Sequence, residues 1–197
     1  MSKAFISKSI SEAAAVIAQG GVVVCPSEGV LGISCSLYDE SAIERVIRIK
    51  ERDSGKGLII VDCSLENLFA NIDFAKIDEH SKKLMDRMWP GPHTFVLPVK
   101  ESFNSRALRP DHSAAIRITS FETLAALCRK SGTPLISTSA NISGRRAHTL
   151  LKHLDIELFD RVDLILDLPC GGQSQPTSIY DTISHSLVRE GPFWSDI

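Results

Sequence analysis

The chain has 197 residues, of which 43% are hydrophobic and 23% are charged, and its formal net charge is −2. This composition is typical of one globular domain with a substantial core, and the charge excludes a general attraction to nucleic acid or acidic membranes, although a local basic patch stays open. No window approaches the roughly 20 apolar residues of a membrane span and no signal peptide is recognisable, so we expect a cytoplasmic protein without membrane contact.

Helices and strands alternate along the first third of the chain. Ser9 stands three residues before Glu12, which is a capping-box spacing for a short helix that ends at Gly20 and Gly21. The run "VVVCP" at residues 22–26 indicates a strand that is buried on both faces. An amphipathic helix over residues 40–52 and a buried strand over residues 56–62 follow.

The same alternation continues to the end of the chain. We predict helices over residues 79–89, 121–132 and 150–160, with strands at 93–99, 114–119 and 134–138. Three further short strands are expected at 163–167, 177–182 and 186–190. This pattern predicts an α/β domain around a mostly buried sheet and leaves the strand order open. Because no linker is visible, we expect a single domain over residues 1–197, with its core at about residues 9–190.

The motifs of several large enzyme classes are missing. The chain contains no G-x-x-x-x-G-K-[ST], G-x-G-x-x-G, G-x-S-x-G or H-E-x-x-H sequence, which argues against simple NTPases, Rossmann dehydrogenases, α/β-hydrolases and zincins. The five cysteines form no C-x-x-C pair, so we interpret them as reduced thiols. The six scattered histidines favour solvated or core roles, and no protein-bound metal site is predicted.

Two polar groups near the start of the chain occur where a regular element gives way to a loop. Ser27 and Glu28 follow a strand in "CPSEGVLG", which a plain turn would also explain. Lys50, Arg52 and Lys56 lie within seven residues and could hold a polyphosphate, or they could simply compensate a helix dipole. Residues two apart do not share a helix face, so a joint role for Lys50 and Arg52 requires the helix to end there.

A third polar group is a single arginine within an apolar strand. Alternation places Arg117 on the face opposite Ile116 and Ile118 in "AAIRIT". A buried guanidinium is costly without an anionic partner, and either a structural carboxylate or a ligand anion would serve.

The fourth polar group is the stretch "PLISTSANISG". Ser137, Ser139 and Asn141 project from one face if the extended conformation persists, and capping of a following helix is the alternative. Together the four groups indicate a cleft for an anionic nucleotide and a small polar substrate.

The segments "VVVCPSEGVLG", "IKERDSGKGLIIV", "WPGPHTFVLP", "AAIRIT", "PLISTSANISG" and "LVREG" resemble the YrdC-like family, in its short bacterial form, over roughly residues 9–189. The hallmark is the combination of K-x-R at residues 50–52 with S-x-N at residues 139–141. The resemblance implies a single-domain, twisted open α/β sheet with flanking helices and a large concave cleft, without a second C-terminal domain.

The resemblance also implies an activity. Such a protein is a nucleotidyltransferase that forms L-threonylcarbamoyladenylate and pyrophosphate from L-threonine, bicarbonate or CO2, and ATP, with Mg²⁺ on the phosphates. Other bacterial tRNA threonylcarbamoylation proteins would then modify position 37 of ANN-decoding tRNAs. Two alternatives stay open: a module that binds double-stranded RNA or tRNA, and a sister adenylyltransferase of the same fold with another small substrate.

The resemblance assigns roles to ten residues. Those expected to contact ATP are Lys50, Arg52, Lys56, Ser139, Asn141 and Arg189, with Lys50 and Arg52 also catalytic through the phosphates. Those expected to hold threonine are Ser27, Arg117, Ser137 and Thr177. The chain departs from the family pattern at Gly29 and Leu31, where a hydroxyl and an aromatic ring are common.

Overall fold

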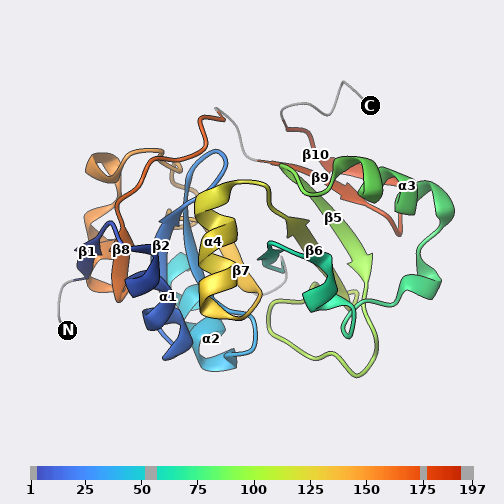
Figure 1. The fold of residues 1–197 in the computed structure, drawn as a ribbon, viewed down its shortest axis with the longest axis horizontal. Helices are drawn as coiled ribbons and strands as arrows, with labels where there is room; N and C mark the ends of the chain where they lie inside the picture. The colour runs from blue at the N-terminus through green and yellow to red at the C-terminus, as the bar shows by residue number, and fades with distance from the viewer. Residues whose placement is uncertain (1–3, 52–56, 174–176, 192–197) are drawn as a thin grey trace.

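The computed structural model of the chain describes residues 4–51, 57–173 and 177–191. Its strands form one mixed sheet in the order β1-β8-β2-β3-β7-β4-β6-β5-β9-β10 (Figure 1). The strands are β1 (Phe5–Ser7), β2 (Val23–Pro26), β3 (Leu31–Ser36), β4 (Ile59–Asp62), β5 (His93–Pro98), β6 (Ser113–Ile118), β7 (Leu135–Ser139), β8 (Leu164–Leu166), β9 (Ser178–Asp181) and β10 (Ser186–Arg189). The predicted α/β class is therefore confirmed.

Among the described residues, four α-helices flank the sheet: α1 (Ile10–Ala18), α2 (Glu40–Lys50), α3 (Glu79–Met88) and α4 (Glu122–Ser131). Short 3₁₀ helices occur at η2 (Leu65–Leu68), η3 (Phe74–Lys76), η4 (Leu151–His153) and η5 (Ile156–Asp160). Among the described residues, no helix combines the length and the apolar character that a bilayer crossing requires.

The continuous apolar run at β2 is buried on both sides of the sheet. Val23 and Cys25 pack in a core with residues of α1 and α4, whereas Val22 and Val24 pack in the other core with residues of α2. Figure 1 shows α1 and α4 side by side over one part of the sheet. The prediction of a doubly covered strand is confirmed because alternate side chains enter the two cores.

The expected helix over residues 150–160 is wrong. The structure has η4 and η5 instead, and Leu154 between them is extended, with φ −61° and ψ 137°. Leu154 and Leu158 are both buried in the core. Their burial at this turn overrides the local helical pattern, and the short helix η5 leads directly towards β8.

Strand β3 was not predicted from the sequence. It pairs antiparallel with β2 on one side and with β7 on the other. Its sequence LGISCS mixes small and polar residues, so it lacks the β-branched run that marks β2. Its insertion is what places the segment after β2 next to the S-x-N strand.

Helix boundaries near the site follow from local chemistry. Helix α2 ends at Lys50, and Glu51 adopts a left-handed conformation with φ 48°. The chain therefore leaves the helix within the K-x-R segment, as a joint role for its two cations requires. At the other end of the chain, Ser9 caps α1 and accepts a hydrogen bond from the Glu12 amide at 3.3 Å.

Candidate functional site

A cavity of about 700 Å³ lies over the strands β7, β4, β6 and β5. Its floor is a row of residues that are paired across these strands: Ser137 with Ile59, Ile59 with Ala115, and Ala115 with Val96. The residues of this row share one face of the sheet, which is the face that α1 and α4 cover elsewhere. The cavity therefore occupies the part of that face that the two helices leave uncovered.

Arg117 is the most deeply buried cation that lines this cavity. It reaches the cavity from the face predicted by alternation, and its Nε lies 3.1 Å from Glu28 Oε1 in an ion pair. The pair lacks hydrogen-bond geometry at Nε, but Thr119 donates a hydrogen bond to the same Glu28 oxygen at 2.6 Å. Both paired side chains are only 5% exposed. The structural-carboxylate alternative for Arg117 is thus confirmed, while a ligand anion stays a prediction.

Thr177 connects Arg117 to a second guanidinium. Its hydroxyl accepts from Arg117 Nη1 at 3.3 Å and from Arg189 Nη2 at 3.4 Å. Arg189 Nε also donates to the Thr177 carbonyl at 2.8 Å. Strand order brings these residues together, because β9 and β10 join the sheet beside β5. Arg117, Thr177 and Arg189 all line the cavity and bring two guanidinium groups to this end.

Two further hydroxyls predicted to hold threonine also line the cavity. Ser27 lies at the turn after β2, where its hydroxyl donates to the Val30 carbonyl at 2.7 Å. Ser137 lies on β7 and is 6% exposed. The structure therefore brings Ser27, Arg117, Ser137 and Thr177 to one cavity, although they are widely separated in the sequence.

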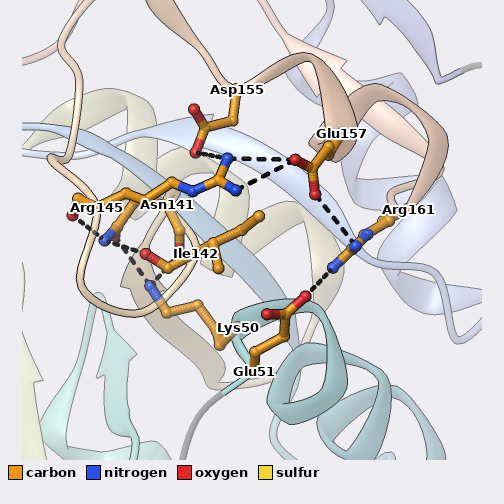
Figure 2. Close-up of polar contacts among 8 residues, drawn as sticks. All are labelled: Lys50, Glu51, Asn141, Ile142, Arg145, Asp155, Glu157 and Arg161. Carbon is orange, nitrogen blue, oxygen red and sulfur yellow. Dashed lines mark hydrogen bonds and ion pairs between the residues drawn. The ribbon is translucent and has the colours of Figure 1, made fainter.

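The S-x-N segment behaves differently from the prediction of one continuous face. Strand β7 ends at Ser139, and only Ser139 lines the cavity, whereas Asn141 follows a bend. The buried Lys50 ammonium donates to the carbonyls of Ser139 and Asn141 at 2.5 and 2.7 Å. It also donates to Asn141 Oδ1 at 3.0 Å (Figure 2). Asn141 is thus directed towards Lys50 and away from the cavity wall.

The remaining predicted cations are not all described. Arg52 and Lys56 lie outside the described residues, so their assignment to ATP stays a prediction. Lys50 does not itself line the cavity among the described residues, and its contacts organise the strand end that does. Its ammonium approaches the Ser139 hydroxyl at 3.3 Å.

Arg109 is a cavity residue that sequence reasoning missed. Its guanidinium pairs with Asp181 at 3.2 Å and with Asp111 at 3.4 Å, and both Arg109 and Asp111 line the cavity. Gly57 makes this position possible: it has φ 58°, and a Cβ there would lie 2.7 Å from Arg109 Cγ. Arg109 belongs to no recognised sequence motif, and its place in the cavity wall follows only from the residues that the fold brings next to it.

Glu28 is the second residue that sequence reasoning left without a role. It is 4% exposed, and its backbone carbonyl accepts a hydrogen bond from Gln173 at 3.0 Å. The requirement of a buried arginine for an anionic partner left a structural carboxylate and a ligand anion as alternatives, and it did not point to Glu28.

Thiols and histidines take no direct part in the cavity wall as described. All five cysteines are free, and burial raises the pKa of the Cys25 thiol to about 11. Burial lowers the pKa of His93, whose ring contacts Ser178 at 2.8 Å. Within residues 4–51, 57–173 and 177–191, no group of three or more His, Cys, Asp or Glu side chains could hold a metal ion.

Comparisons with known proteins match this chain over nearly its full length. The model of the Sua5/YciO/YrdC family, described as telomere recombination, matches residues 15–191. A protein of Xanthomonas campestris named threonylcarbamoyl-AMP synthase is 38% identical over 182 residues, covering 92% of this chain and 97% of the relative.

Two solved structures share the fold. The crystal structure of P. abyssi Sua5 complexed with L-threonine has a TM-score of 0.85 at 28% identity, covering 96% of this chain and 57% of that protein. The crystal structure of E. coli YciO has a TM-score of 0.81 at 26% identity, covering 98% of this chain and 97% of that one. The chain belongs to the Sua5/YciO/YrdC family.

Proposed function

We propose that this chain is a threonylcarbamoyl-AMP synthase, a nucleotidyltransferase that uses L-threonine, bicarbonate or CO2, and ATP. The observation that carries the proposal is one cavity with two distinct ends. One end holds the guanidinium groups of Arg117 and Arg189 around Thr177, and the other is the strand end at Ser139. The Xanthomonas relative carries this name, and P. abyssi Sua5 binds L-threonine.

The Arg117 end suits the amino acid. A substrate carboxylate that is transferred from water into a cavity is stabilised most strongly by a guanidinium, because this group offers two parallel hydrogen-bond donors. Glu28 occupies the Nε side of Arg117, and Thr177 accepts from Nη1. We assign the remaining donors of the guanidinium to the substrate carboxylate, and the hydroxyls of Ser27 and Ser137, which line the same cavity, to the rest of the amino acid.

The Ser139 end suits the nucleotide phosphates. Lys50 fixes this strand end, and the following segment carries Arg52 and Lys56, which we assign to the triphosphate. Mg²⁺ is expected to arrive on the phosphate oxygens, because it keeps several waters and needs few protein ligands. Asp111 is the carboxylate on the described cavity wall, where it pairs with Arg109 at 3.4 Å.

The proposed reaction needs positioning more than acid–base chemistry. The threonine amine bonds to the carbon of CO2 and loses a proton, which gives a carbamate anion. A carbamate oxygen then bonds to the α-phosphorus of ATP, and the bond to the bridging oxygen breaks so that pyrophosphate leaves. The attacking group is already an anion, so cations that meet the phosphate charge and a fixed approach supply the catalysis.

The product would pass to other bacterial tRNA threonylcarbamoylation proteins for modification of position 37 in ANN-decoding tRNAs. This step follows from the proposed activity, since the adenylate is a mixed anhydride and a reactive acyl donor. Direct contact of this chain with tRNA forms part of the same proposal and is tested separately by binding to duplex RNA.

The decisive experiment incubates the purified protein with ATP, Mg²⁺, bicarbonate and a single amino acid, and follows pyrophosphate release together with product mass. We expect release with L-threonine and a product with the mass of threonylcarbamoyl-AMP, and no release when bicarbonate is omitted. Adenylate formation with another small amine would support the sister enzyme instead. Absence of any adenylate, together with tight binding of duplex RNA, would support the RNA-binding alternative.

A further inference from the structure

Five residues close to Lys50 are linked to one another by ion pairs, and we call them the ion-pair chain. It consists of Glu51, Arg161, Glu157, Arg145 and Asp155, and Figure 2 shows them in succession. Arg161 pairs with Glu51 at 3.0 Å and with Glu157 at 3.2 Å. Arg145 pairs with Glu157 at 3.3 Å and with Asp155 at 3.7 Å. Glu157 is the shared carboxylate at its centre.

One part of the ion-pair chain is fixed firmly to the core. Glu157 lies on η5, which buries Leu158 completely. The backbone of the same helix is held by the Ala4 amide, which donates to the Phe159 carbonyl at 2.6 Å. Glu157 therefore projects from a helix that is anchored to the core, whereas its partner Arg145 lies on a different segment, after β7.

Asp155 and Arg161 are the residues that cap η5, whereas Glu51 and Arg145 belong to two segments at the Ser139 end of the cavity. Glu51 directly follows Lys50 at the end of α2. Arg145 lies in the segment after β7, where its carbonyl accepts a hydrogen bond from Asn141 Nδ2 at 2.6 Å. The Ser143 amide donates to the Lys50 carbonyl at 2.9 Å, so the two segments also contact each other.

The segment that carries Arg145 continues into the cavity wall. Ala147 lines the cavity, and the carbonyl of His148 accepts from the Leu31 amide of β3 at 2.8 Å. Displacement of Arg145 would therefore shift both Asn141, which holds Lys50, and the wall at Ala147. The short spacing between these residues leaves little chain to absorb such a movement.

We propose that Glu157 is a positioning residue for the nucleotide end of the cavity. It acts by pairing with Arg145, which ties the segment after β7 to helix η5, and by orienting Arg161, the C-cap residue of η5 that pairs with Glu51 at the end of α2. This inference rests on the proposed function, because it assigns the positioned end to ATP. It gives a role to a charged residue that does not itself line the cavity.

The partial exposure of the ion-pair chain makes it sensitive to salt. The side chains of Arg145 and Glu157 are 50% and 43% exposed, so their attraction is screened by mobile ions. The wild-type protein at high ionic strength should therefore approach the behaviour of a variant that lacks the Glu157 charge.

The test compares Glu157→Gln with the control Glu122→Gln. The control removes an ion pair with Arg129 on α4, where the carboxylate is 79% exposed, and neither residue lines the cavity. Hydrogen–deuterium exchange of ligand-free protein is measured over residues 141–148, and steady-state kinetics give KM for ATP and for L-threonine. The double variant Arg145→Gln/Glu157→Gln completes the set.

We expect Glu157→Gln to exchange several-fold faster over residues 141–148 and to raise KM for ATP about 3- to 10-fold, with KM for L-threonine unchanged. Glu122→Gln should match wild type, and the double variant should exchange at least as fast as the single variant, because it also removes the pair of Arg145 with Asp155. Unchanged exchange, or faster exchange with unchanged KM for ATP, would overturn the inference. If no protein forms product, wild type included, the proposed function fails, and the exchange data still decide whether Glu157 holds the segment.

Discussion

Replacement of Arg117 by methionine tests the buried ion pair and the threonine assignment together. Arg117 and Glu28 are each only 5% exposed, so removing the cation leaves a buried carboxylate without its charge partner. Breaking such a pair typically costs about 3–5 kcal/mol of folding free energy. We expect the lower end, about 3 kcal/mol, because Thr119 still donates a hydrogen bond to Glu28 at 2.6 Å.

The double variant Arg117→Met/Glu28→Gln separates stability from binding. It removes both charges while the introduced amide keeps an oxygen for the Thr119 hydroxyl, so most of the lost stability should return. The substrate carboxylate still lacks the Arg117 guanidinium, and a charge-assisted hydrogen bond contributes about 1.5–3 kcal/mol. This range corresponds to a rise in KM for L-threonine of about 10- to 100-fold in both variants, with KM for ATP much less affected.

Urea denaturation measures the stability of the single variant, the double variant and the exposed control Arg129→Met. Pyrophosphate release at varied L-threonine gives KM in the same proteins. An Arg117→Met protein with wild-type KM for L-threonine would refute the assignment of the carboxylate to Arg117. A double variant as unstable as the single variant would refute the argument that the unpaired Glu28 charge causes the loss.

Two further predictions concern the backbone at the cavity and the buried thiols. Gly57→Ala should lose about 1–2 kcal/mol of folding free energy because of its φ of 58°, and its Cβ should also displace Arg109. The control Gly132→Ala has φ 67° with open space around it, so it should show only the conformational cost. Equal losses of stability in urea denaturation would exclude the Arg109 contact. Burial raises the pKa of Cys25 to about 11 and of Cys35 to about 12, so both thiols should resist a thiol reagent at pH 8 until the protein unfolds. These folded pKa values lie above the unfolded value of 9.0, so the two protonated thiols contribute fully to stability below about pH 9 and less towards pH 11–12. A stability that rises with pH over this range would contradict the expected direction of the pH dependence.

Several features of the site were predictable because they depend on near neighbours in the chain. The period of two placed Arg117 opposite Ile116 and Ile118, and the structure confirms it. A joint role for Lys50 and Arg52 required the helix to end near Lys50, and α2 ends at that residue. The face that a strand residue takes and the end of a helix follow from side-chain alternation and local backbone preferences.

Other predictions failed where the local pattern competes with tertiary packing. The prediction that the extended conformation persists through Asn141 was wrong, because β7 ends at Ser139 and the Asn141 side chain accepts a hydrogen bond from Lys50. The expected helix over residues 150–160 was wrong, because the burial of Leu154 breaks it into η4 and η5. In both cases a contact with a distant residue or with the core decided the local conformation.

The order of residues was enough to establish the α/β class, the strand that carries Arg117 and the hallmark segments that identify the family. The assembled fold was needed to show that Glu28 neutralises Arg117, that Thr177 lies between Arg117 and Arg189, and that Arg109 lines the same cavity. Local periodicity reports contacts between residues two to four positions apart, whereas these pairs are joined by strand order across the sheet. Their geometry therefore exists only once the ten strands have assembled.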